Sequence, residues 1–151
     1  MAQHRITASA LLSAPARQVY ATIADYRDGH PRILPKPPFV SLAVERGGIG
    51  AGTVIDLQMR VLGKRRSLRG TVTEPEPGRV IVETYSGADT ATRFTVEPRD
   101  GGRRAQVTIA TDLPVHSGFL GTVEGWLATR LLRPVYLKEL RQLEAVAATR
   151  A

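Results

Sequence analysis

The stretch that decides the fold is an alternating run, TVIDLQMRV, at residues 53–61. Mostly apolar side chains occupy every second position, and Asp56, Gln58 and Arg60 occupy the positions between them. A period of two residues is typical of an antiparallel strand that buries one face and exposes the other. The run therefore predicts a sheet that covers a core on one side only. The residues that share its buried face are Thr53, Ile55, Leu57, Met59 and Val61.

The same alternation recurs on both sides of this run. Short segments rich in Gly, Pro and Asp separate the alternating stretches, and such segments are typical of tight turns between antiparallel neighbours. We therefore expect residues 38–112 to form one continuous antiparallel sheet, joined by a strand from the N-terminus. The predicted strands cover residues 3–12, 39–46, 52–62, 65–74, 79–86, 90–98 and 103–112.

Two short helices are predicted between the first strand and the second. Ser13 can cap the first of them, and Pro15 suits its first turn. Asp28-Gly29 ends this helix. A second helical turn is expected at residues 30–34, because the prolines that follow it prevent its continuation.

After the strands, the period of the sequence changes to that of a helix. Apolar residues from position 119 onward recur at spacings of three and four, with Pro134 among them. We predict one helix over residues 120–147, kinked at Pro134, that lies across the concave face of the sheet. A cavity between the two should be lined by Leu57, Met59, Phe94 and residues of this helix. The predicted helical stripe consists of Leu120, Val123, Leu127, Leu131, Val135, Leu140 and Leu143.

Motifs near the N-terminus resemble a known group of proteins. The strand at residues 6–10, the helix start at 13–20 and the Asp25-Tyr26 pair are similar to the START-like superfamily, which includes polyketide cyclase/dehydrase and lipid-transport domains. Tyr26 followed by residues 30–35 (HPRILP) also resembles its quinone-binding branch.

This resemblance implies a single START-like ligand-binding domain over residues 1–151 with an α+β helix-grip fold. In that fold a curved seven-stranded antiparallel sheet wraps around a long C-terminal helix, and two short helices follow the first strand. Members bind sterols, lipids, hormones or polyketides, and a minority catalyse aldol-type cyclisation or dehydration.

Side chains on the elements around the expected cavity are the candidate functional residues. A mostly apolar pocket with few convergent polar groups is typical of small-molecule sites. The candidates for ligand binding are Tyr26, Leu57, Met59, Tyr85, Arg93, Phe94, Trp126 and Arg130. A Tyr or His can transfer a proton, so the candidates for catalysis are Tyr26, His30 and His116. The alternative for each polar candidate is a structural or exposed role, and for each apolar one it is core packing.

Several other chemistries have no motif in this chain. It contains no Cys, which excludes disulfides and thiol nucleophiles and fits a cytoplasmic location. His4, His30 and His116 lack the spacing of a helical metal site, so no metal and no other cofactor is expected. The glycine-rich segment 47–52 leads into a strand, which favours a hairpin turn over a phosphate-binding loop.

The net charge of +7 raises the question of a polyanionic partner. The densest basic cluster, Lys64-Arg65-Arg66, has no neighbouring aromatic residues for base stacking. We therefore expect a solvated basic face and no specific nucleic acid, with contact to an anionic membrane as the alternative. The sequence sets no oligomeric state.

Three functions are consistent with these features. The sequence favours a non-enzymatic protein that binds or carries a hydrophobic small molecule, such as a lipid, a polyketide or a quinone-like compound. The first alternative is a cyclase or dehydratase, a lyase-type enzyme that acts through polar cavity residues. The second is a basic interaction module for anionic partners.

Overall fold

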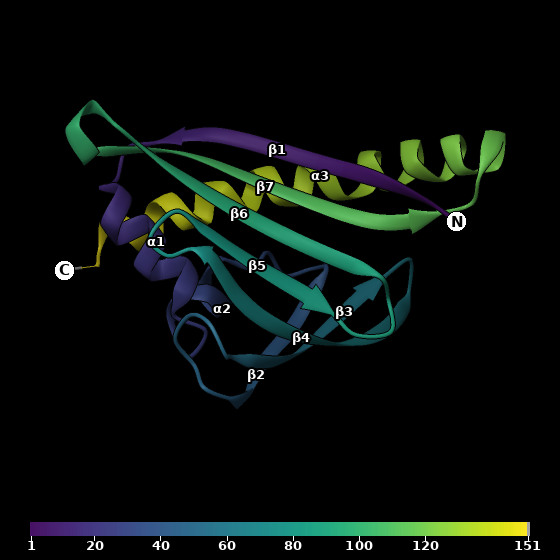
Figure 1. The fold of residues 1–151 in the computed structure, drawn as a ribbon, viewed down its shortest axis with the longest axis horizontal. Helices are drawn as coiled ribbons and strands as arrows, with labels where there is room; N and C mark the ends of the chain where they lie inside the picture. Colours follow the sequence, from purple (N-terminus) through teal and green to yellow (C-terminus); the bar gives the residue numbers. More distant parts are fainter. Residues whose placement is uncertain (151) are drawn as a thin grey trace.

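The computed structural model of this chain describes residues 1–150 (Figure 1). Two short helices follow the first strand, and one long helix follows the last. The helices are α1 (Ala16–Ala24), α2 (Gly29–Ile33) and α3 (Gly118–Ala148), and a 3₁₀ turn, η1, spans Asp100–Gly102. The strands are β1 (Ala2–Leu12), β2 (Phe39–Arg46), β3 (Val54–Val61), β4 (Lys64–Glu76), β5 (Val80–Tyr85), β6 (Thr90–Arg99) and β7 (Arg104–Val115).

All of these strands belong to one antiparallel sheet in the order β1-β7-β6-β5-β4-β3-β2. Strands β2 to β7 follow one another as hairpins, and β1 pairs with β7 at the far edge. The sheet curls around α3, which runs along its concave side (Figure 1). The predicted α+β helix-grip fold, with its curved seven-stranded sheet and closing helix, is confirmed.

The register of the sheet places rows of residues side by side on the concave face. Glu83 lies opposite Thr92, which in turn lies opposite Thr111. In the next row Ile81, Phe94 and Ile109 are neighbours in the same way, and all three are buried. A polar row therefore runs directly beside an apolar one.

The start of α1 differs from the prediction. This helix begins at Ala16 after Pro15, and no side chain caps it. Ser13 lies too far before the first turn to reach its free amides, and its own backbone N–H donates to the Glu144 carboxylate at 2.7 Å. The short second helix is present at Gly29–Ile33, close to the predicted 30–34.

Two glycines on one side of α3 allow it to lie close to β1 and to the β7–α3 connection. A Cβ atom at Gly125 would lie 2.6 Å from Nδ1 of His4, and a Cβ at Gly121 would overlap the carbonyl oxygen of His116. The His4 ring is held there by a 2.8 Å hydrogen bond between its Nε2 and Oγ1 of Thr129. Only glycine permits this approach, so the two glycines set the rotation of the helix about its axis.

This rotation corrects the predicted buried stripe of α3. Leu140 and Leu143, in the second half of the helix, are buried as expected. Leu120, Leu127 and Leu131, in the first half, are exposed. In the first half the glycine-bearing side faces β1 and the β7–α3 connection, which turns these leucines toward solvent. No helix within residues 1–150 has both the length and the hydropathy that crossing a bilayer requires.

The close approach of α3 yields a stability prediction. Gly121→Val should lower the free energy of unfolding by about 2 kcal/mol, because the new side chain overlaps backbone that cannot move freely. Thr122→Val adds the same side chain at an exposed neighbouring position and serves as the control. Urea unfolding followed by circular dichroism measures both. Equal stability of the two variants would contradict the role assigned to Gly121.

Candidate functional site

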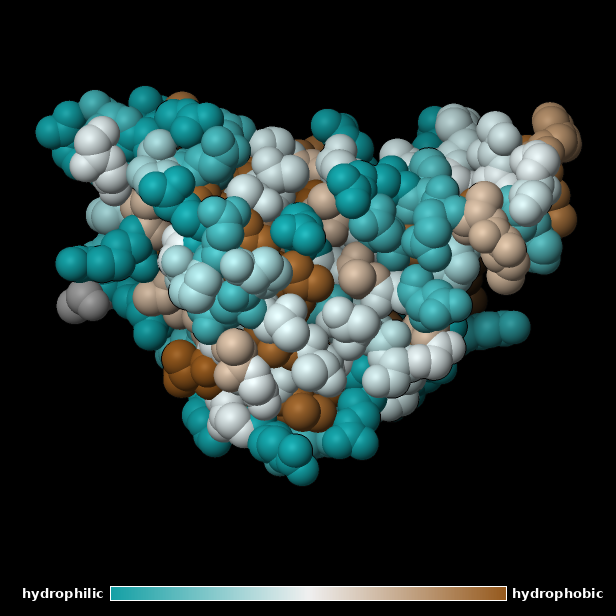
Figure 2. Space-filling model, in the orientation of Figure 1, coloured by the Kyte–Doolittle hydropathy of each residue, from teal (hydrophilic) through white to brown (hydrophobic). Residues whose placement is uncertain are grey.

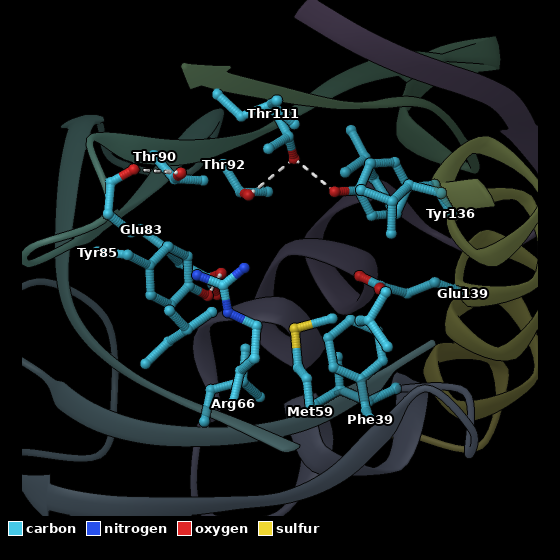
Figure 3. A pocket seen from close by; sticks show the side chains of 18 of the residues that line it. Phe39, Met59, Arg66, Glu83, Tyr85, Thr90, Thr92, Thr111, Tyr136 and Glu139 are labelled. Atoms are coloured by element: carbon cyan, nitrogen blue, oxygen red, sulfur yellow. Dashed lines mark hydrogen bonds between the residues drawn. The ribbon is translucent and has the colours of Figure 1, made fainter. Parts of the chain in front are cut away.

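A cavity of about 500 Å³ lies between the concave face of the sheet and α3. Most of its wall is apolar and comes from the strands β2, β3, β6 and β7 and from the middle of α3 (Figure 3). The apolar wall consists mainly of Leu34, Phe39, Leu42, Leu57, Met59, Val61, Leu68, Phe94, Ile109, Leu113, Leu131 and Leu132.

The cavity has an open end and a buried end. Its lining includes Arg66, Gly87 and Leu131, which are exposed, so it reaches the surface between the β3–β4 hairpin, the β5–β6 turn and α3. The lining at the other end includes Glu83 and Glu139, whose exposed fractions are only 3% and 2%. Two carboxyl groups are therefore withdrawn from water at the inner end of an apolar pocket.

Glu83 is the centre of a hydrogen-bonded cluster. The hydroxyl of Tyr26 donates to its Oε2 at 2.7 Å, and the hydroxyl of Tyr85 donates to its Oε1 at 2.6 Å. Burial, together with the charge of Glu83, raises the pKa of both tyrosines well above the ordinary value. Both hydroxyls thus remain protonated donors to the Glu83 carboxyl group.

His30 completes this cluster from α2. Its Nδ1 lies 2.8 Å from the carbonyl oxygen of Ile23, which can only accept, so Nδ1 carries a hydrogen. The other nitrogen, Nε2, lies 3.3 Å from Oε2 of Glu83. The two side chains form a buried ion pair when the ring is protonated. The ring stacks on Tyr26 at 4.4 Å between centroids and meets the edge of Phe94. Packing on both sides fixes its orientation.

Glu139 projects from α3 into the same cavity (Figure 3). Burial is the largest cause that raises the pKa of its carboxyl well above the ordinary value, and the nearby charge of Glu83 raises it further. Burial accordingly favours the protonated form of Glu139, which can donate a hydrogen bond. The two carboxyls of the cavity thus have different surroundings: Glu83 accepts two tyrosine hydrogen bonds, and Glu139 is buried beside it.

A row of hydroxyl groups connects the sheet to α3 beside these carboxyls. Oγ1 of Thr92 and Oγ1 of Thr111 are 2.8 Å apart, and Oγ1 of Thr111 is 2.8 Å from the hydroxyl of Tyr136 (Figure 3). All three residues line the cavity. Hydroxyls can donate or accept, so this row can adapt to either kind of polar ligand group.

The structure brings most of the sequence candidates together. Leu57, Met59, Tyr85, Phe94 and His30 line the cavity, which agrees with the predicted lining by Leu57, Met59 and Phe94. Tyr26 is fully buried behind the wall and reaches the cavity only through its bond to Glu83.

Four candidates lie outside the cavity, and their predicted positions are corrected. Arg93 is exposed on the outer face of β6, because its neighbours in the strand point inward and adjacent strand residues face opposite sides. Trp126 and Arg130 lie on the solvent side of α3, where the guanidinium carbon of Arg130 is 5.0 Å from the centre of the indole ring. His116 is exposed and pairs through Nδ1 with Glu124 at 2.8 Å.

The two buried carboxyls were missed by the sequence analysis, although the sequence carries a signal for each. Glu83 alternates with Ile81 and Tyr85 in a strand, so it shares their inward side. Glu139 follows Tyr136 by three positions and precedes Leu143 by four, which places it on their face of the helix. In both segments an acidic residue occupies an inward position of an apolar pattern.

Residues 1–150 contain no group of three or more His, Asp or Glu side chains suited to hold a metal ion.

Comparison with known proteins agrees with the fold described above. Residues 3–148 match the model of a family described as polyketide cyclase/dehydrase and lipid transport. Among solved structures, the KanY protein is similar at 26% identity and a TM-score of 0.82, over 97% of this chain and 99% of that chain. The sequence has no match among curated proteins.

Two more distant structures support the fold alone. The Zhui aromatase/cyclase from Streptomyces sp. R1128 is 19% identical with a TM-score of 0.73, over 97% of this chain and 94% of that chain. A START superfamily protein from Mycobacterium smegmatis is 16% identical with a TM-score of 0.74, over 95% of this chain and 99% of that chain.

The raised pKa of Glu139 predicts a pH-dependent effect on stability. As the pH rises past the ordinary glutamate pKa, the unfolded chain releases this proton while the folded protein keeps it, so Glu139 progressively destabilises the fold. Glu139→Gln removes this ionisation and keeps the shape. The variant should therefore gain more unfolding free energy over the wild type at about pH 8 than at about pH 4.

Urea unfolding at the two pH values measures this difference. Glu97→Gln removes a half-exposed carboxylate on the outer face and should show little change in its offset between them. An offset for Glu139→Gln that is the same at both values would mean that Glu139 is ionised in the folded protein.

Proposed function

Since this chain belongs to the polyketide cyclase/dehydrase and lipid transport family, we propose that it binds a hydrophobic small molecule in the cavity between the sheet and α3. The observation that carries the proposal is the cavity itself. Its volume of about 500 Å³ falls within the usual range for small-molecule sites, about 300–1,000 Å³. Its mainly apolar wall is also typical of such sites.

The distribution of polar groups suggests how such a ligand lies. Glu139 in its neutral form and the hydroxyl of Tyr136 offer hydrogen bonds at the inner end, whereas the wall toward the mouth is mainly apolar, with Arg66 at its rim. A ligand with a carbonyl or hydroxyl group at one end and an apolar body matches this arrangement. Lipids, polyketides and quinone-like compounds all include molecules of that kind.

Filling the cavity should abolish this binding. Met59→Trp places a larger side chain in the wall and should weaken binding of the uncharged fluorophore N-phenyl-1-naphthylamine by about tenfold or more, because the probe loses its buried apolar contacts. Arg60→Trp adds the same side chain at the next position, which is exposed, and should leave binding unchanged. Fluorescence titration measures both, with circular dichroism as the test of folding. Unchanged binding in Met59→Trp would place the site elsewhere.

A second candidate function rests on the two carboxyl groups. A dehydratase or aldol-type cyclase needs a base that removes a proton beside a carbonyl and an acid that protonates the departing hydroxyl as water. Glu83 accepts hydrogen bonds from two tyrosines and lies beside His30, which suits it to the role of the base. Burial raises the pKa of Glu139, which suits it to the role of the acid. The carrier function remains our first proposal, because Glu83 is already engaged by three partners.

The two functions differ in a measurable way. With an aryl β-hydroxy ketone as the test compound, a carrier should bind without forming the enone, and His30→Ala and Glu139→Gln should weaken affinity by several-fold through lost polar contacts. His116→Ala, which lies outside the cavity, is the control and should leave affinity unchanged. Enone formation that collapses in Glu139→Gln while binding persists would identify an enzyme.

A further inference from the structure

The first half of α3 exposes large apolar side chains on one face. Phe119 is 83% exposed and Trp126 is 57% exposed, and three leucines between and beyond them are also exposed. At 3.6 residues per turn these positions fall on one side of the helix. We call this set the outer apolar face; it consists of Phe119, Leu120, Trp126, Leu127 and Leu131.

The outer apolar face is a fixed feature of the fold. Gly125 packs the opposite side of α3 against β1, and Gly121 packs it against the β7–α3 connection, so the helix cannot rotate to bury its larger residues. Single exposed apolar residues are ordinary, but a contiguous group is a sign of an interaction surface. Figure 2 shows tan and brown atoms at the right-hand end of the molecule, where α3 begins in Figure 1.

This face continues into the mouth of the cavity. Leu131 belongs to the outer apolar face and also lines the cavity. On the opposite lip, Val61 lines the cavity, and the next residue, Leu62 at the tip of the β3–β4 hairpin, is 82% exposed. Exposed apolar side chains therefore stand on both sides of the opening.

Positive charge surrounds the same opening. Arg130 and Arg133 lie on the exposed side of α3, and the β3–β4 hairpin carries Lys64-Arg65-Arg66. The acidic residues nearby are few: Glu124 on α3 is paired with His116, and Asp89 lies in the β5–β6 turn. The surface around the mouth is thus apolar and basic together.

We propose that this end of the molecule docks on an anionic lipid bilayer, with the outer apolar face and Leu62 inserted and the basic residues at the headgroups. Aromatic and leucine side chains flanked by arginine and lysine are typical of helices that lie in the membrane interface. A second copy of the chain fits less well, since it would bring two basic surfaces together. Docking in this orientation places the mouth against the hydrocarbon, so an apolar ligand passes to the cavity without crossing water.

Trp126 provides the measurement, because it is the chain's single tryptophan and part of the docking surface. Vesicles of phosphatidylcholine mixed with phosphatidylglycerol should shift its emission to the blue, and vesicles of phosphatidylcholine alone should not. Salt should reverse the shift, since it screens charge attraction at the surface. Arg133→Gln should lower the partition coefficient about fivefold, and Leu127→Glu should lower it by more than about tenfold.

A matched variant and two further measurements complete the test. Ile49→Glu introduces the same charge at an exposed apolar residue away from the mouth, beside α1, and should bind vesicles nearly as well as the wild type. Equal losses in Ile49→Glu and Leu127→Glu would overturn the proposal, as would binding to poly-glutamate without binding to anionic vesicles, which indicates an acidic protein partner. A blue shift that depends on protein concentration without lipid would assign the surface to a second copy of the chain.

Discussion

The close packing of α3 at two glycines, Gly125 against β1 and Gly121 against the β7–α3 connection, is the constraint on which the rest of the structure depends. Because a Cβ at either position would overlap neighbouring atoms, this side of the helix must face His4 of β1 and the backbone of His116. The rotation that follows directs Tyr136 and Glu139 into the cavity and directs the outer apolar face to solvent. The pocket and the surface beside its mouth thus both depend on how α3 is packed.

Burial gives the inner end of the cavity its chemical character. Glu83 tolerates its position because two tyrosine hydroxyls and His30 surround it with partners. Burial, and then the nearby charge of Glu83, raises the pKa of Glu139 and favours its neutral form. Removing an acid from water without a cation beside it lowers stability at neutral pH, and proteins commonly retain such groups where function requires them. This contrast between the carboxyls gives the cavity both an acceptor and a donor.

The cavity and the outer apolar face together suggest a route for the ligand. The apolar wall extends from the mouth, where Leu131 and Val61 lie, to the hydroxyl row of Thr92, Thr111 and Tyr136. A ligand that enters with its polar end first would have its apolar body against the apolar wall. None of its own polar groups would lie at the mouth. On a membrane, the surroundings of that mouth would be hydrocarbon rather than water.

The sequence by itself determined the order of the elements, the antiparallel hairpins and the inward side of β3, because a period of two or 3.6 residues is a local property of the chain. It also placed Leu57, Met59 and Phe94 on the cavity wall. Arg93 and Phe94 were both predicted to bind the ligand, but neighbours in a strand face opposite sides of the sheet. Only the sheet register decides which of the two points inward. Only the tertiary structure decided the rotation of α3 and the raised pKa of Glu139. It also brought Glu83 together with Tyr26, Tyr85 and His30. Each depends on which distant segments exclude water from a side chain, and no local pattern in the sequence records that.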